Sequence, residues 1–300
     1  MSHSSPNVLV GALLDDRYRV VQHVTTGGVG HLYVVEDVHA RGRVKPCFAA
    51  KILRFEHLDD DTLQARFARE IEATTRIRDP HVLKLFHQGK LPSGVPYFVA
   101  ELLTGMDLAD RLELNRRLAP RQAVNIAAQI AQALAAAHRA GVVHRDLKPE
   151  NVFLAHAADG GEHIKLLDFG FSWINEDPSE VFSGRLTLSR TGVGTPEYVA
   201  PEQAFGDIGR PAADIYSLGI VLYEMLEGRV PFDGSPEMIL QQHVRALPPP
   251  LEHGSPELRR IVERALAKEP PSRYESATEM AEALLATPEG AGLAKPSPSN

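Results

Sequence analysis

The chain has 300 residues, of which 43% are hydrophobic and 24% charged, a balance typical of a soluble globular protein with a full core. Its formal net charge of -7 argues against a general binder of nucleic acid or of anionic membranes, because both need a basic surface. Cys47 is the only cysteine, so no internal disulfide can form, and a reducing compartment is expected.

The first third of the chain is predicted to form mainly strands. Short segments rich in β-branched or aromatic residues alternate with turn residues at Tyr18–Val24, Leu32–Asp37, Cys47–Ile52, Lys84–Gly89 and Tyr97–Glu101. One helix is expected at Thr62–Arg78, where Leu63, Phe67 and Ile71 recur at helical spacing. It ends before Pro80, because a proline disfavours helical geometry in the preceding residue.

The remainder is predicted to be mainly helical. The expected helices are Leu108–Leu114, Pro120–Arg139, Pro211–Glu227, Pro236–Arg245, Pro256–Ala267 and Ser276–Ala286. Residues 1–15 and the Pro-, Gly- and Ser-rich residues 287–300 are expected to be flexible. Since the sequence shows neither a signal peptide nor an apolar run long enough for a membrane span, we expect a cytoplasmic protein.

Two motifs near the middle of the chain carry chemistry. The run HRDLKPEN extends from His144 to Asn151, and Asp168-Phe169-Gly170 follows it. In-line transfer of the γ-phosphoryl group of ATP needs a carboxylate for the substrate hydroxyl proton, two magnesium ligands and a cation near the moving charge. Asp146 supplies the carboxylate and Lys148 the cation, while Asn151 and Asp168 are the candidate Mg²⁺ ligands.

The motifs together resemble those of the eukaryotic-like (Hanks-type) protein kinases, and more narrowly those of bacterial serine/threonine kinases. The resemblance covers roughly residues 16–286 and includes the Ala-Pro-Glu-Gln run that ends at Gln203. It implies an α+β fold with a β-rich N-lobe (16–103) holding one main helix and a mainly helical C-lobe (104–286). It also implies transfer of phosphoryl groups from Mg²⁺-ATP to serine or threonine hydroxyls of proteins.

A glycine-rich loop and a lysine form the expected phosphate-binding side. Gly27 and Gly30 lack the Cβ that would hold backbone amides away from phosphates. Thr25 stands where the family has its first glycine, so altered nucleotide affinity is expected. By resemblance, Lys51 contacts the phosphates and pairs with a helix glutamate. Glu70 and Glu72 are the candidates, and Glu70 is the one that matches the family.

The adenine and ribose contacts are carried over from the family, onto Leu32, Ala49, Glu101, Leu103, Asp107 and Phe153. Leu32 and Ala49 are expected on one face of the base and Phe153 on the other. The Glu101 carbonyl and the Leu103 backbone would read its edge, and Asp107 would meet the ribose. Ala100 occupies the gatekeeper place, so either Phe153 compensates for its small volume or a back pocket opens.

The segment after Asp168 contains the expected regulatory residues. Thr195 resembles the residue that hydrogen-bonds the catalytic aspartate and lysine of serine/threonine kinases. Arg145 is expected to hold a phosphate on the activation loop. The candidate autophosphorylation sites are Thr187, Ser189 and Thr191, and a loop already ordered without phosphate is the competing hypothesis.

Two structural contacts are also expected in the C-lobe. Glu202 is expected to pair with Arg273, and Asp214 to hold the backbone of the catalytic loop, His144–Asn151.

A nucleotide-binding pseudokinase scaffold is the main alternative function, and a small-molecule phosphotransferase is a third. Proteins with serine or threonine acceptors are the expected partners, and an N-lobe homodimer is possible by resemblance.

Overall fold

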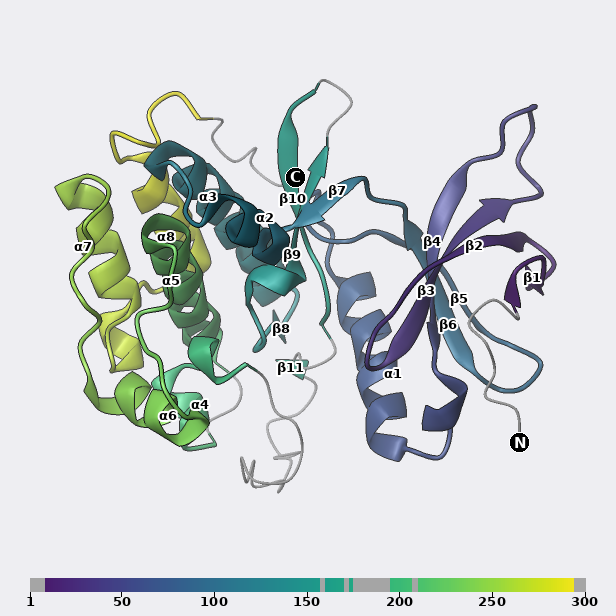
Figure 1. The fold of residues 1–300 in the computed structure, drawn as a ribbon, viewed down its shortest axis with the longest axis horizontal. Helices are drawn as coiled ribbons and strands as arrows, with labels where there is room; N and C mark the ends of the chain where they lie inside the picture. Colours follow the sequence, from purple (N-terminus) through teal and green to yellow (C-terminus); the bar gives the residue numbers. More distant parts are fainter. Residues whose placement is uncertain (1–8, 157–159, 170–172, 175–194, 207–209, 294–300) are drawn as a thin grey trace. The chain divides into compact units, whose positions relative to one another are not determined.

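The computed structural model describes residues 9–156, 160–169, 173–174, 195–206 and 210–293 (Figure 1). The chain divides into two compact units, the first made of Met1–Thr75 and Leu83–Thr104 and the second of Arg76–Val82 and Gly105–Asn300. Strands dominate the first unit and helices the second, which confirms the predicted α+β fold.

The first unit is built on a six-stranded antiparallel sheet, in the order β1-β2-β3-β4-β6-β5. Its strands are β1 (Leu13–Leu14), β2 (Tyr18–Thr26), β3 (Gly30–Asp37), β4 (Cys47–Leu53), β5 (Leu85–Lys90) and β6 (Pro96–Glu101). Alternate side chains enter a core that includes Tyr33, Val35 and Ile52, as the period of two in a strand requires. The predicted strands are therefore present, with boundaries shifted by a few residues.

One long helix, α1 (Asp61–Arg76), packs beside this sheet (Figure 1). The Asp60 carboxylate starts it by accepting hydrogen bonds from the backbone N–H groups of Thr62 and Leu63, at 3.0 and 3.1 Å. On the buried side of α1, the ring of Phe67 lies 5.5 Å from that of Phe98 on β6. A short 3₁₀ helix, η2 (Phe55–His57), connects β4 to α1.

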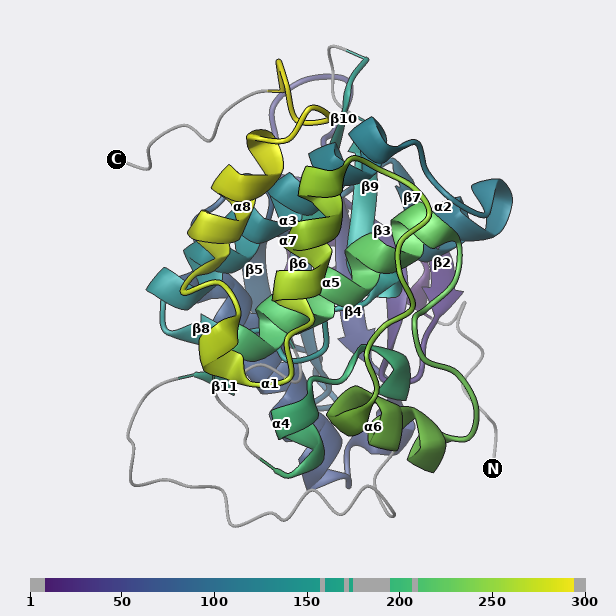
Figure 2. The same ribbon diagram turned by 90° about the vertical axis from the view of Figure 1, so that its left-hand side faces the viewer.

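The helices of the second unit include α3, the long and alanine-rich helix that was predicted at the same residues. They are α2 (Leu108–Asn115), α3 (Pro120–Arg139), α4 (Pro201–Ala204), α5 (Pro211–Glu227), α6 (Pro236–Arg245), α7 (Pro256–Ala265) and α8 (Ala277–Leu285). Helix α3 packs against α5 and α8, and α5 packs against α7 (Figure 2). None of the helices in the described part of the chain is both long and apolar enough to cross a lipid bilayer.

Short strands and 3₁₀ helices carry the functional loops of the second unit. The strands are β7 (Gly105–Asp107), β9 (Val152–His156) and β10 (Glu162–Leu166) in one small sheet, and β8 (Val142–Val143) with β11 (Trp173–Ile174) in another. The 3₁₀ helices are η3 (Pro149–Asn151), η4 (Pro196–Tyr198) and η5 (Pro270–Ser272).

Residues 9–15 and 287–293 make tertiary contacts, while the rest of the two segments that were predicted to be flexible, 1–8 and 294–300, lies outside the described residues. Near the N-terminus, Leu14 is buried and the Asp15 carboxylate lies 2.7 Å from Nε2 of His87. Near the C-terminus, the Glu289 carboxylate accepts hydrogen bonds from Ser255 N and Oγ, at 2.7 and 2.9 Å. These contacts join segments far apart in the sequence, which composition does not reveal.

Candidate active site

Lys51 on β4 and Glu70 on α1 form the ion pair that the sequence predicts. Nζ of Lys51 lies 2.7 Å from both carboxylate oxygens of Glu70, and the two side chains are 24% and 8% exposed. Because the pair is largely shielded from water, the attraction between its charges is stronger than it would be on the surface. Glu72, two residues along the helix, is exposed.

Leu32, Ala49 and Lys51 share one face of the sheet. Leu32 lies opposite Lys51 in the β3–β4 ladder, and Ala49 precedes Lys51 by two residues on the same strand. Ala100 lies opposite Ala49 in the β4–β6 ladder and is 1% exposed. The residues expected beside the adenine ring within the first unit are thus side by side.

The other expected adenine and ribose residues lie at the end of β6 and in the second unit. Glu101 ends β6, and its carboxylate accepts a hydrogen bond from Lys84 N at 2.8 Å. Leu103 follows two residues later. Asp107 caps α2 by accepting from Asp110 N at 2.8 Å, and it lies opposite Phe153 in the β7–β9 ladder. The contacts of these residues with a nucleotide remain a prediction.

Gly30 has a structural reason of its own to be glycine. A Cβ at this position would lie 2.8 Å from the Ile52 carbonyl oxygen of the neighbouring strand, which is too close for any side chain. A Cβ on Gly27 would meet only the Gly30 oxygen, at 3.7 Å. The close approach of β3 and β4 therefore accounts for Gly30 without reference to a ligand.

The catalytic loop brings Asp146, Lys148, Asn151 and Thr195 together. Lys148 Nζ lies 3.4 Å from Asp146 Oδ2 and 3.3 Å from Thr195 Oγ1. Asn151 donates from Nδ2 to the Asp146 backbone oxygen at 2.8 Å and to its Oδ2 at 3.3 Å. Burial raises the pKa of Asp146 above its usual value, although the charge of Lys148 opposes this.

Asp214 holds the backbone of this loop, as the sequence predicts. Its Oδ1 accepts from Arg145 N at 2.8 Å, and its Oδ2 accepts from His144 N at 2.9 Å. His138 Nε2 lies 2.7 Å from the same Oδ2, a contact that the sequence did not indicate. Arg145 has a φ of 70°, in the left-handed region that non-glycine residues rarely adopt, so the two backbone hydrogen bonds fix a strained segment.

The electrostatics of Asp214 follow from these contacts. Complete burial acts to raise the pKa of its carboxyl group, but the hydrogen bond from His138 and the charges of His138 and His144 act in the other direction. The net effect is a pKa below the usual value. Asp214 is therefore the charged acceptor that the two backbone amides need.

Asn151 and Asp168 fit the expected magnesium site. The Nδ2 of Asn151 is used in hydrogen bonds to Asp146, so its amide oxygen is the atom left for a cation. Leu167 N donates to the Asn151 backbone oxygen at 2.8 Å, which places Asp168 next to this residue. Mg²⁺ prefers such oxygen ligands and takes only one or two from the protein when it binds nucleotide phosphates. Elsewhere in the described residues, no group of three or more His, Cys, Asp or Glu side chains is suited to hold a metal.

Phe169, which follows Asp168, packs against the loop that begins at His144. The ring of Phe169 is fully buried and lies 4.7 Å from that of His144. His144 Nε2 lies 3.0 Å from the Leu167 backbone oxygen. His144 therefore packs against Phe169 and lies within hydrogen-bonding distance of the residue before Asp168.

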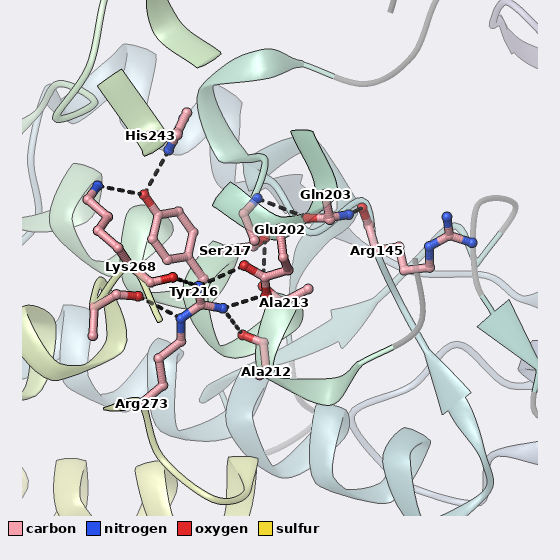
Figure 3. Close-up of polar contacts among 12 residues, drawn as sticks. Arg145, Glu202, Gln203, Ala212, Ala213, Tyr216, Ser217, His243, Lys268 and Arg273 are labelled. Atoms are coloured by element: carbon pink, nitrogen blue, oxygen red, sulfur yellow. Dashed lines mark hydrogen bonds and ion pairs between the residues drawn. The ribbon is translucent and has the colours of Figure 1, made fainter. Parts of the chain in front are cut away.

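A buried arginine anchors the segment that follows Thr195 (Figure 3). Arg273 donates from Nη1 and Nη2 to the two carboxylate oxygens of Glu202, at 2.6 and 2.8 Å, which confirms the predicted pair. It also donates to the backbone oxygens of Ala212, Ala267 and Lys268. These acceptors satisfy a guanidinium group that is completely buried.

Gln203 connects this segment to the catalytic loop, a role that sequence reasoning missed. Its Oε1 accepts from Ala200 N at 2.9 Å, and its Nε2 donates to the Arg145 backbone oxygen at 3.2 Å (Figure 3). Gln203 and Arg145 are 58 residues apart in the sequence. Only the position of Gln203 directly after Glu202 in the motif suggested a function for it. The phosphorylation candidates Thr187, Ser189 and Thr191 lie outside the described residues.

The sequence was compared with protein-family models and with known proteins. The family model described as "Protein kinase domain" matches residues 18–285. The chain is 34% identical to serine/threonine-protein kinase PrkC of Bacillus subtilis over 278 residues, covering 91% of this chain and 41% of that protein. It is 35% identical to PknB of Mycolicibacterium smegmatis (92% and 44% covered) and 38% identical to pkn2 of Myxococcus xanthus (94% and 33% covered). The chain therefore spans less than half the length of each of these relatives.

Proposed function

The chain belongs to the protein kinase family, and on this basis we propose that it is an ATP-dependent protein serine/threonine kinase. It transfers the γ-phosphoryl group of Mg²⁺-ATP to serine or threonine hydroxyls of protein substrates. The observation that carries the proposal is the convergence of Lys148 on both the Asp146 carboxylate, at 3.4 Å, and the Thr195 hydroxyl, at 3.3 Å.

Each group has a distinct role in the proposed reaction. Asp146 orients the incoming hydroxyl and accepts its proton, and its raised pKa suits a group that must take up a proton. Lys148 stabilises negative charge on the γ-phosphoryl group, and Thr195 positions both side chains. Lys51, held by Glu70, contacts the phosphates of the nucleotide.

Asn151 and Asp168 would hold Mg²⁺, which neutralises charge on the β- and γ-phosphates when it is bound. The backbone hydrogen bond between Leu167 and Asn151 fixes the spacing of these two ligands. Asn151 also donates to the Asp146 backbone oxygen at 2.8 Å and to its Oδ2 at 3.3 Å, so one residue orients the base and serves the metal.

The intact ion pairs favour an enzyme over the pseudokinase scaffold. Lys51 and Glu70 are paired at 2.7 Å, and the catalytic loop is held by a charged Asp214. A scaffold without activity needs neither a paired Lys51 nor an ordered Asp146. By the same proposal the protein acts in the cytoplasm, is activated through Thr187, Ser189 or Thr191, and uses Arg145 to hold the new phosphate. A homodimer through the first unit belongs to this proposal as well.

The test is transfer of labelled phosphate from Mg²⁺-ATP to the purified chain and to a generic basic protein. We expect Asp146→Asn to lose at least about 10³-fold in rate while it still binds nucleotide, because the base and its charge are lost but the binding groups remain. Asp59→Asn, at an exposed aspartate before α1, is the matched control and should match the wild type. Mapping of modified peptides then identifies the acceptor residues.

The outcomes separate the two functions. Incorporation that is lost in Asp146→Asn establishes the kinase. Binding of Mg²⁺-ATP without any incorporation, even after treatment with an active kinase, would instead establish the scaffold.

A further inference from the structure

The loop between β2 and β3, residues 27–29, is held by hydrogen bonds from the segment that follows β4. His57 Nε2 lies 2.9 Å from the Gly28 backbone oxygen, and since a carbonyl only accepts, the ring nitrogen donates. Arg54 N donates to the next carbonyl, that of Val29, at 3.1 Å. Two successive carbonyls at the tip of the loop therefore face the same segment.

This fastening orients the amides of the loop. In a trans peptide the N–H group points in the direction opposite to the carbonyl of the same unit, and the described chain has no cis peptide bonds. The N–H groups of Val29 and Gly30 therefore point away from His57 and Arg54. Within the described part of the chain, the amides of Gly28 and Val29 donate no hydrogen bond. The Val29 N–H group is therefore both directed away from His57 and without a hydrogen bond, so it can donate to an anion.

Further contacts fix the start and the middle of the loop. Thr26 Oγ1, at the end of β2, lies 3.0 Å from His23 Nε2 and 2.9 Å from His31 Nδ1. The Val29 side chain packs against the core of the first unit. The tip, in contrast, has Gly28 exposed to solvent, so the His57 hydrogen bond is the side-chain contact that sets its peptide plane.

We propose that His57 is a positioning residue for nucleotide phosphates. It holds the Gly28 carbonyl so that the Val29 amide is presented to the phosphate oxygens of a bound nucleoside triphosphate. The inference rests on the proposed function, because it assigns the phosphates of the kinase nucleotide to this loop. His57 belongs to none of the sequence motifs and touches neither Lys51 nor Glu70 in the described contacts.

The role can be separated from a structural one by comparing two ligands. Mg²⁺-ATP and adenosine share base and ribose, but only ATP carries phosphates. Dissociation constants for both are measured by titration calorimetry with the wild-type chain, His57→Ala, His57→Leu and His57→Gln. His39→Ala is the matched control, because His39 is exposed and only its backbone N–H makes a hydrogen bond.

We expect His57→Ala and His57→Leu to weaken Mg²⁺-ATP binding by about two- to tenfold and to leave adenosine binding unchanged. His57→Gln should restore the wild-type constant, because its side-chain amide can donate from a similar place. The control should bind both ligands as the wild type does.

The contrary results are distinct. If the ratio of the two constants is unchanged in both His57→Ala and His57→Leu, or if both ligands weaken equally, His57 does not position phosphates, although the kinase proposal stands. If the wild-type chain binds Mg²⁺-ATP no more tightly than adenosine, the loop holds no phosphate, and the proposed function is overturned with it.

Discussion

A single carboxylate, that of Asp214, organises the backbone around the proposed catalytic base. It receives hydrogen bonds from two consecutive amides and from His138, all between 2.7 and 2.9 Å. In an asparagine variant, the side-chain NH2 group would face one of these N–H donors. The position therefore needs both the negative charge and two acceptor oxygens. The Asp214 carboxylate holds both amides in place, and this offsets the energetic cost of the strained φ of Arg145.

His243 makes the stability of the protein depend on pH. Burial, with the charge of Lys268, lowers its pKa to about 4 from 6.5, and its Nδ1 lies 2.8 Å from the Tyr216 hydroxyl. Between these pH values the unfolded chain binds a proton that the folded chain does not. Stability therefore rises as the pH rises from 4 to 6.5, by roughly 3 kcal/mol from this residue, and is complete above that range.

The measurement is the free energy of unfolding by urea at pH 4.5 and pH 7, for wild type and His243→Gln. The variant keeps a polar contact for Tyr216 but cannot titrate, so the difference between the two pH values should shrink by most of that amount. His39→Gln, at an exposed position, should leave the difference as it is. An unaltered pH dependence in His243→Gln would contradict the expectation.

Ala100, in the gatekeeper place, is a second position where the size of one side chain should affect stability. Ala100 is 1% exposed and belongs to the core of the first unit, so we expect no room beside it. Ala100→Leu should lower the free energy of unfolding by about 1–3 kcal/mol through overpacking. Ala68→Leu, on the exposed side of α1, is the control and should be close to neutral. An equally stable Ala100→Leu would reveal an open back pocket, which ATP-competitive compounds with a bulky aromatic group should then fill.

At the scale of helices, proline and serine signals made most boundaries predictable. Helices α3, α5, α6 and α7 begin with proline in the first turn, and α3, α5 and α6 have the predicted bounds. Ser276 caps α8 instead of belonging to it, a difference of one residue. The short strands were not predicted, because a segment such as β1, with only two residues, has no period and exists through its partner.

Helices α5 and α7 approach closely at a glycine, and this contact gives a test of packing. A Cβ on Gly219 would lie 2.9 Å from Ala265 Cβ and 2.9 Å from Leu266 Cδ2. Gly219→Ala gains about 1 kcal/mol in helix propensity but is expected to lose more through overpacking, with a net loss of about 1–2 kcal/mol.

A double-mutant cycle measured by urea unfolding identifies the cause. In an Ala265→Gly background one of the two crowding atoms is absent, so Gly219→Ala should cost less there. An equal cost in both backgrounds would show that the contact with Ala265 is not responsible.

At the scale of the whole molecule, binding of nucleotide should stabilise the fold. At about 100 times its dissociation constant, a ligand that binds only the folded state contributes roughly 2.7 kcal/mol. We expect Mg²⁺-ATP to raise the melting temperature by about 5 °C and more than ATP with a chelator does. Asp168→Ala should remove the magnesium-dependent part, and Asp59→Ala should not. A magnesium-dependent rise that survives in Asp168→Ala would exclude Asp168 as a ligand.

The sequence predicted the fold class and the paired charges, but not the residues that join separate segments. Lys51 with Glu70 and Glu202 with Arg273 were predicted because each partner lies in a recognisable motif. His138 meets Asp214 across 76 residues and Gln203 meets Arg145 across 58, and these contacts depend on how the helices pack. Such contacts have no local pattern, so only the three-dimensional structure reveals them.

The packed N-terminal segment has a consequence for aggregation. Gly11 N and Ala12 O exchange backbone hydrogen bonds with Val20, and Leu14 pairs with Tyr18, so this segment covers the outer edge of β2. A chain shortened at residue 16, as the sequence pattern invites, would expose that edge together with the aromatic side chain of Tyr18. Exposed edges of this kind recruit strands from other molecules, so the shortened protein would be prone to self-association.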